Sequence, residues 1–160
     1  TGAITQYLCE RYSPDRLGRP VDDPDRMAWL VWVHFAETIS QHTAALTQQH
    51  VALREDHMRS PIVMKLEAAR IAKCYDALEA RLSTPVENRD YLLTSGFSAA
   101  DISVGQAVYM SRYFVKLDQH PAVAEWYARI TARDSFAKSL PTEGGIYEQE
   151  FYPPWPIEKV

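Results

Sequence analysis

The sequence predicts an all-α fold, a bundle of helices, and two observations carry this prediction. Signals for the start of a helix recur along the chain, in which a capping residue stands before a proline or before an apolar run. After each signal, apolar residues follow at steps of three and four, the spacing of one face of a helix. The alternation of apolar and polar residues that is typical of a strand is absent from the sequence.

The clearest helix start is at Ser98. With Ser98 as the N-cap and Asp101 at the third helical position, the Ser98 hydroxyl accepts from the Asp101 N–H and the Asp101 carboxylate accepts from the Ser98 N–H, which is a capping box. Phe97 and Ile102 flank this box at the spacing of a hydrophobic staple. The apolar run continues to Val115, so we expect the central helix of the bundle here.

Two helices are expected before it, separated by a linker. Residues 2–12 carry apolar residues at four-residue spacing and predict a short amphipathic helix. Residues 13–24 contain three prolines, one glycine and five charged residues, a composition typical of a linker. Asp23 then serves as an expected N-cap with Pro24 at the first helical position. The long helix that follows is apolar all round over residues 27–36, which predicts burial on several sides, and turns polar over residues 37–50, which predicts exposure or a cleft.

The remaining helices have similar signals. Ser60 followed by Pro61 predicts a helix that ends near Leu82. Pro121 opens an amphipathic helix that reaches Ile130, and Asp134 is expected to cap a short helix that ends at Leu140. Residues 143–160 are rich in aromatic residues, and we expect this tail to lie back over the bundle.

Composition excludes several classes of partner. The 160 residues are 46% hydrophobic and 24% charged, as in one folded domain with a sizeable core. A net charge of −4 with scattered basic residues argues against nucleic acid or an acidic membrane as a partner. The longest apolar run, Met27–Val33, is too short to span a membrane. Cys9 and Cys74 form no C-x-x-C pair, which favours a reducing, cytoplasmic location.

Motifs for chemistry are sparse. The histidines at 34, 42, 50 and 57 have spacings that drift around a helix, so no metal site is expected. Neither a nucleophile elbow nor a phosphate-binding glycine loop is present. Cys9 is either a catalytic thiol or, as we prefer, a small apolar filler. Tyr109 and Tyr113, one turn apart with Arg112 beside them, either project hydroxyls into a cleft or fill the core with a polar tip at the surface.

Several of these segments, in order, resemble the cytosolic glutathione transferases. Gly96–Ile102 resembles the capping box and staple of the central helix in the all-α C-terminal domain of that family. Tyr91-Leu92-Leu93 resembles the lead-in to this helix, and Pro121–Ile130 resembles the helix that follows it. Residues 1–12 resemble the segment that closes the thioredoxin-like N-terminal domain. Phe151–Trp155 is similar to the ends of bacterial members, whereas Thr94-Ser95 departs from the usual glycine-first turn.

The resemblance implies a division of the chain and a function. Residues 1–12 would be the last helix of a truncated thioredoxin-like domain, 13–24 a linker, and 25–160 the C-terminal helical domain. The parent enzyme would conjugate the thiolate of its co-substrate glutathione, bound mainly by the missing domain, to a small apolar electrophile. Thr1 stands at the place of the family serine that binds the γ-glutamyl group. The thiol-activating residue of the family is not in this chain, so we expect no catalytic residue and no activity from these residues alone.

By the same analogy, six residues would form the walls of the electrophile pocket, and they come from the long helix and the central helix: Val33, Glu37, Ser40, Tyr109, Met110 and Tyr113. The long helix would also form a homodimer contact. The resemblance implies no metal. Other classes remain open, namely a non-catalytic assembly module of the same fold, a redox or dehalogenating variant of the enzyme, and an unrelated helical bundle.

Overall fold

The computed structural model describes residues 1–84, 90–142, 147 and 149–152. These residues form helices and turns, and no strand occurs among them, so the predicted all-α fold is confirmed. In chain order the elements are α1 (Gly2–Tyr12), α2 (Arg26–Thr47), a π-helical turn (Gln48–Ala52), a 3-10 turn (Asp56–Met58), α3 (Pro61–Ser83), α4 (Ala99–Ser111), α5 (Pro121–Thr131) and α6 (Asp134–Ser139).

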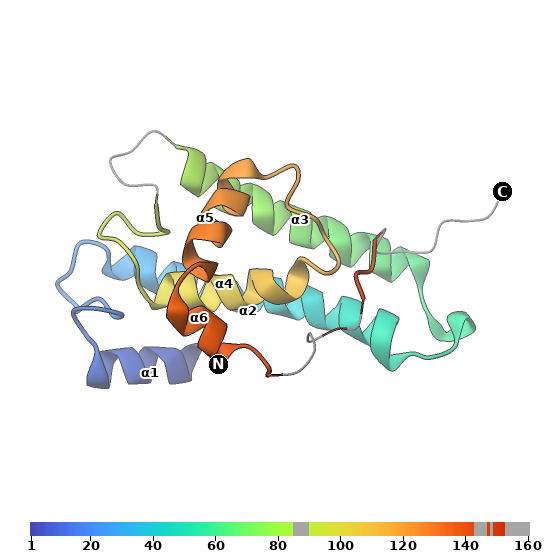
Figure 1. The fold of residues 1–160 in the computed structure, drawn as a ribbon, viewed down its shortest axis with the longest axis horizontal. Helices are drawn as coiled ribbons and strands as arrows, with labels where there is room; N and C mark the ends of the chain where they lie inside the picture. Colours follow the sequence, from blue (N-terminus) through green and yellow to red (C-terminus); the bar gives the residue numbers. More distant parts are fainter. Residues whose placement is uncertain (85–89, 143–146, 148, 153–160) are drawn as a thin grey trace.

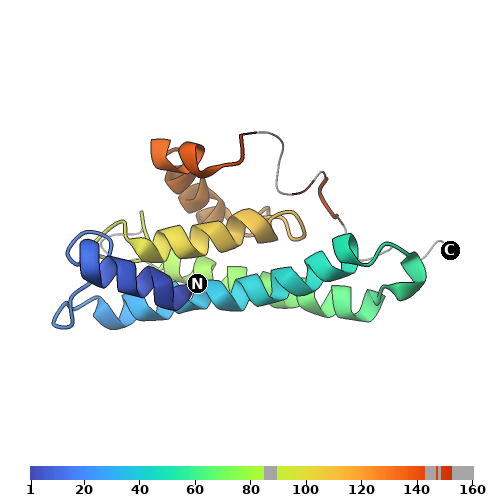
Figure 2. The same ribbon diagram turned by 90° about the horizontal axis from the view of Figure 1, so that it is seen from below.

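The two long helices organise the bundle. Helices α2 and α3 run side by side in opposite directions, and α4 lies along α2 in the same direction as α2 (Figure 1). Helix α5 crosses the bundle and leads into α6, while α1 lies along the outer side of α2 and α4 (Figure 2). Helix α4 is therefore in contact with α1, α2 and α5.

The core follows the three- and four-residue spacing of the sequence. Helices α2, α3 and α4 turn their apolar stripes toward one another, and α5 adds a valine, a tryptophan and an isoleucine. The largest fully buried side chains include Trp29, Ile39, Leu46, Met64, Ile71, Tyr75, Leu78, Phe114 and Trp126. The expected start of α3 is also observed, because the Ser60 hydroxyl accepts from the Val63 N–H at 3.4 Å with Pro61 at the first helical position.

The start of α2 differs from the prediction. Asp23 is not the N-cap, since the helix begins at Arg26 with Asp25 before it. Asp23 instead forms a turn, in which its carboxylate accepts from the Asp25 N–H at 2.7 Å. The Asp25 carboxylate accepts from the Ser95 N–H at 2.9 Å and from the Thr94 hydroxyl at 3.0 Å. This long-range contact fixes Asp25 at the N-cap and leaves Pro24 outside the helix.

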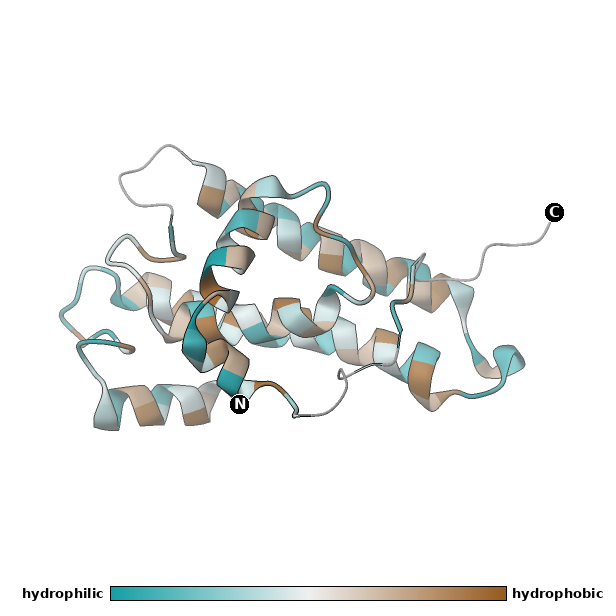
Figure 3. Ribbon diagram, in the orientation of Figure 1, coloured by the Kyte–Doolittle hydropathy of each residue, from teal (hydrophilic) through white to brown (hydrophobic). Residues whose placement is uncertain are grey.

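The prediction of burial on several sides for residues 27–36 is confirmed only in part, since most of its apolar residues pack against the core but two do not. Trp29, Val33 and Ala36 are buried, but Met27 is 70% exposed and Val31 is 52% exposed. The reason is that α1, α3 and α4 all contact α2 but leave the face with Met27 and Val31 uncovered by any described element. Helix α1 shows the same feature, because its residues Ile4, Tyr7, Leu8 and Tyr12 are all exposed. Figure 3 shows brown, apolar bands along α1.

The last described elements show one correction and one agreement. Asp134 is not the N-cap of α6 but its first helical residue, with Arg133 in the cap position, and the helix ends at Ser139. The tail folds back as expected where it is described. The Phe151 ring stacks on Phe114 at 5.1 Å, and the Phe151 N–H donates to the Tyr113 carbonyl at 2.8 Å.

The remainder of the expected tail contact, Trp155 included, lies outside the described residues. A search of the described helices finds none with the length and apolar character to cross a membrane.

Candidate functional site

Helix α4 is positioned by the capping box at its first turn. The Asp101 carboxylate accepts from the Ser98 N–H at 2.9 Å, and the Ser98 hydroxyl accepts from the Ala100 N–H at 3.1 Å. The same carboxylate also accepts from the Leu92 N–H at 3.0 Å and from the Trp126 indole N–H at 2.9 Å. Asp101 thus joins the start of α4, the loop before it and the centre of α5.

Asp101 has no exposed surface. Burial raises the pKa of its carboxyl, while the N–H donors of Leu92, Trp126 and Ser98 act in the opposite direction. A buried carboxylate with three N–H donors is a positioning group for the helices around it. The chain enters this arrangement through Gly96, whose φ of 101° is the one positive value among the described residues.

Phe97 and Ile102, the residues of the predicted staple, both lie partly at the surface. Ile102 is 49% exposed. Phe97 packs edge-on against Tyr91, at 5.5 Å between ring centroids, and the Arg133 guanidinium lies 3.8 Å above its ring. Both residues of the expected staple line one cavity, and this places them beside a candidate site.

A pocket lies where α1, α2 and α4 meet, and we call it the α2–α4 pocket. It has a volume of about 270 Å³. Four of the residues that the sequence analysis selected line it together: Thr1, Val33, Glu37 and Ser40. Helix α4 adds Ile102, Ser103 and Gln106, none of which the sequence analysis selected as a pocket residue. The available signal was the spacing of Ile102 and Gln106, which lie one turn apart on one face of the helix.

Glu37 links α2 to the start of α1. Its carboxylate accepts from the Gly2 N–H at 3.2 Å, and the Thr1 hydroxyl donates to the same oxygen. An anion beside the first N–H groups of a helix is favourable because these groups have no partner within the helix. Glu37 therefore holds α1 against α2 and forms one end of the α2–α4 pocket.

The three predicted pocket residues from α4 are not among those that line this pocket. Tyr109 is buried, with its ring edge-on to Tyr113 at 6.2 Å and to Phe136 at 5.9 Å. Tyr113 packs against Tyr147, at 5.1 Å between centroids. Tyr109 and Met110 lie about two turns beyond Ile102 along α4, and Tyr113 lies just past the end of that helix. The two tyrosines pack their rings against other aromatic rings.

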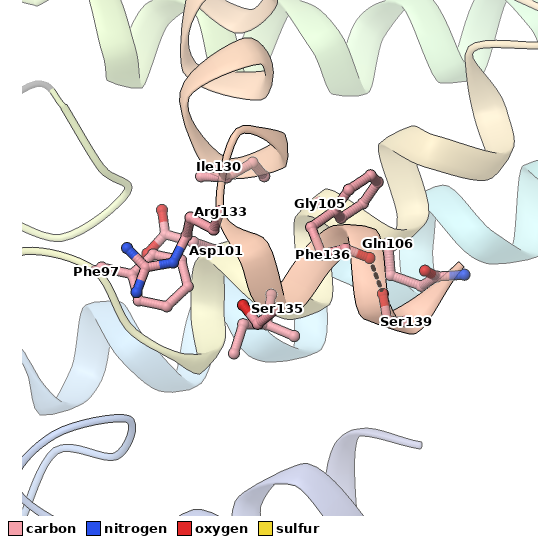
Figure 4. Close-up of a pocket in the computed structure, with 10 residues that line it drawn as sticks. Phe97, Asp101, Gly105, Gln106, Ile130, Arg133, Ser135, Phe136 and Ser139 are labelled. Carbon is pink, nitrogen blue, oxygen red and sulfur yellow. Dashed lines mark hydrogen bonds between the residues drawn. The ribbon is translucent and has the colours of Figure 1, made fainter.

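A second cavity lies on the other side of Ile102, between α4, α5 and α6, and we call it the α4–α6 pocket. Its volume is about 330 Å³. Ile102 and Gln106 line both pockets and so form the wall between them. Figure 4 shows Arg133 beside Phe97 at one end of this cavity and Phe136 near Gly105 at the other.

The histidines and cysteines were the other candidates for chemistry in the sequence. Over the described ranges, no three His, Cys, Asp or Glu side chains gather closely enough to hold a metal ion. His42 instead pairs with Glu67 at 2.7 Å, and His120 with Asp76 at 2.9 Å. Burial raises the pKa of the Cys9 thiol, aided by the Glu10 carboxylate, and burial also raises that of Cys74. Both thiols are therefore poor nucleophiles, which supports the filler role.

A comparison with protein families identifies this chain. Residues 48–129, just over half of the sequence, match the family described as the glutathione S-transferase C-terminal domain. The α-helical fold and the capped central helix thus define a domain of the glutathione transferase type. The chain belongs to the glutathione S-transferase C-terminal domain family. No curated protein sequence matches it significantly.

Solved structures of glutathione transferases share the fold. A glutathione transferase homolog from Lodderomyces elongisporus, solved with two glutathione molecules per subunit, matches with a TM-score of 0.74 and 20% identity over 86% of this chain and 63% of that one. Ure2p5 from Phanerochaete chrysosporium, cocrystallized with 1-(S-glutathionyl)-2,4-dinitrobenzene, matches with a TM-score of 0.72 and 20% identity over 86% of this chain and 64% of that one.

A glutathione S-transferase from Methylobacillus flagellatus, with glutathione bound, matches with a TM-score of 0.72 and 22% identity over 86% of this chain and 67% of that one. This chain thus spans less than two thirds of the length of the first two structures.

Proposed function

We propose that this domain forms one wall of the electrophile pocket of a glutathione-conjugating enzyme. The observation that carries the proposal is the α2–α4 pocket, in which Val33, Glu37 and Ser40 of α2 meet Thr1, the N-cap of α1. Thr1 stands at the end of the pocket where the glutathione γ-glutamyl group would bind. The apolar electrophile would lie against Val33 and Ile102.

The pocket fits the chemistry of a small apolar electrophile. Val33, Ala36 and Ile102 provide apolar surface, and Ser40 and Gln106 add polar groups. Binding there would hold an electrophilic carbon next to the glutathione sulfur, and proximity of this kind lowers the barrier to a bimolecular reaction. The thiolate forms a C–S bond with that carbon, and the leaving group departs with its bonding electrons as an anion.

Two exposed apolar surfaces support a larger assembly. The outer side of α1 is apolar and uncovered by any described element, so we propose that residues 1–12 close a thioredoxin-like domain that holds glutathione. Residues 13–24 would link it to the helical domain of residues 25–160. Met27 and Val31 on α2 would form part of a homodimer contact. We also propose that the enzyme is a bacterial-type member of the family and acts in the cytoplasm.

A non-catalytic assembly module is the second candidate. One observation favours it, because the Thr1 hydroxyl and the Glu37 carboxylate in the α2–α4 pocket are hydrogen-bonded to each other. Polar groups that satisfy each other have less to offer a ligand. In that case the fold would present surfaces such as α1 to partner proteins without chemistry in the pocket.

A conjugation assay separates the two candidates. The polypeptide that the gene encodes around these residues is mixed with glutathione and 1-chloro-2,4-dinitrobenzene, and the conjugate is followed by its absorbance. The enzyme proposal predicts conjugation well above the uncatalysed rate and retention on immobilised glutathione. Absence of both would rule it out in favour of the assembly module. The 160 residues alone should give no turnover.

A further inference from the structure

A third hollow lies at the C-terminal end of α4, and it shares no lining residue with the two pockets beside Ile102. We call it the Arg112 hollow, and its volume is about 360 Å³. It lies between the turn after α4, helix α5 and the described end of the tail. Four charged side chains and two tyrosines line it: Arg112, Lys116, Asp118, Tyr127, Glu150 and Tyr152.

Arg112 is held by aromatic rings in place of a counter-ion. Its guanidinium carbon lies 4.9 Å from the centroid of the Tyr113 ring and 5.4 Å from that of Tyr109. No carboxylate of the described residues forms an ion pair with it, and its buried Nε has no hydrogen-bond acceptor there. A partly buried guanidinium whose Nε–H has no acceptor among the described residues favours a ligand that supplies one, and a planar carboxylate matches its geometry best.

The other charges lie close to the same place. The Lys116 ammonium is 4.9 Å from the centroid of the Tyr152 ring. Burial raises the pKa of Tyr152 to about 12, the Glu150 and Asp118 carboxylates add to this rise, and Arg112 opposes it. Positive and negative side chains therefore both lie close enough to act on the Tyr152 hydroxyl. Burial also raises the pKa of Tyr127 to about 12, so the two hydroxyls are protonated donors at neutral pH.

We propose that the Arg112 hollow binds an α-amino acid with an apolar side chain. The carboxylate would pair with Arg112 and Lys116, the ammonium with Asp118 or Glu150, and the side chain would lie on the ring of Tyr127. A lining with two cations and two anions favours a zwitterion, because a simple anion would also meet both carboxylates. The volume leaves room for the whole amino acid.

Three compounds with one carbon frame test this proposal. The 160-residue chain is titrated with L-phenylalanine, with 3-phenylpropionate, which lacks the ammonium, and with 2-phenylethylamine, which lacks the carboxylate. Two-dimensional amide NMR spectra should show L-phenylalanine shifting the amides of residues 112–118 and 149–152. Each of the other compounds should bind at least about tenfold more weakly. No shift of these amides with L-phenylalanine, or equal affinity for either partial compound, would overturn the proposal.

Variants identify the residues involved. Arg112→Gln, and the double variant Asp118→Asn with Glu150→Gln, should each weaken L-phenylalanine binding at least about tenfold. Lys73→Gln, an exposed control on α3, should leave it unchanged. If Arg112→Gln disturbs the tyrosines that it contacts, as thermal unfolding would show, the exposed double variant decides. Unchanged affinity in that variant contradicts the proposal, and the conjugation proposal is unaffected because its pocket shares none of these residues.

Discussion

Replacement of Asp101 by alanine tests how α4 is held in place. The substitution removes the acceptor of three N–H groups, those of Ser98, Leu92 and the Trp126 indole, which lie at 2.9 to 3.0 Å from the carboxylate. Asp101 is fully buried, so water would not replace the carboxylate without opening the structure. A buried donor without an acceptor costs about 1–3 kcal/mol. We therefore expect Asp101→Ala to lower the free energy of unfolding by about 3–6 kcal/mol, an unusually large loss for one residue.

Urea unfolding followed by circular dichroism measures this loss, and related variants calibrate it. Ser98→Ala removes one cap and should cost about 1 kcal/mol. Asp101→Asn keeps one acceptor oxygen and should fall between the two. Asp134→Ala, which changes an exposed residue in the first turn of α6, should cost only a few tenths of a kcal/mol. A loss below about 1 kcal/mol for Asp101→Ala would refute the assignment of three simultaneous hydrogen bonds.

Three further predictions concern the contacts around α4. A methyl group at Gly105 would lie 2.5 Å from Ile130 Cδ1, the end of a side chain that can rotate away, and alanine is favoured over glycine within a helix by about 1 kcal/mol. Gly105→Ala should therefore change the free energy of unfolding by no more than about 1 kcal/mol in urea, and it should be more favourable in an Ile130→Val background than in the wild type. The Glu79 carboxylate accepts from the N–H groups of Ala122 and Val123, so Glu79→Ala should cost about 1–2 kcal/mol, and no loss would contradict this cap of α5. Burial acts to raise the pKa of Asp25, but the hydrogen bonds from Ser95 and Thr94 outweigh it and lower the pKa below its ordinary 3.8. The contribution of Asp25 to the free energy of unfolding is therefore present above pH 3.8 and is lost as the pH falls through the lowered pKa. The difference in stability between the wild type and Asp25→Asn should shrink on acidification, and a constant difference would contradict this prediction.

Local signals predicted the fold well, and long-range contacts explain the errors. The start of α4 was predictable because the capping box involves only residues 98–101. The start of α2 was not, because Thr94 and Ser95 engage the Asp25 carboxylate from a distant part of the chain. The exposure of Met27 and Val31 could not be predicted either, because an apolar sequence does not show which faces of a helix other elements cover.

The candidate sites were predictable only in part. Val33, Glu37 and Ser40 share one face of α2 through their spacing, and the family resemblance linked that face to Thr1. The α4–α6 pocket could not be predicted, because it depends on how Ile130 approaches Gly105 in space. The same holds for the Arg112 hollow, whose lining residues come from three segments with no shared periodicity.

The central claim is that the α2–α4 pocket forms the electrophile wall, and the variant Ser40→Trp tests it most directly. Ser40 is exposed and lines the pocket, so an indole there should fill space that the electrophile would occupy. In the polypeptide that the gene encodes around these residues, the KM for 1-chloro-2,4-dinitrobenzene should rise at least about tenfold while the KM for glutathione stays within about twofold. Unchanged values of both constants, in a variant that unfolds like the wild type, would contradict the claim.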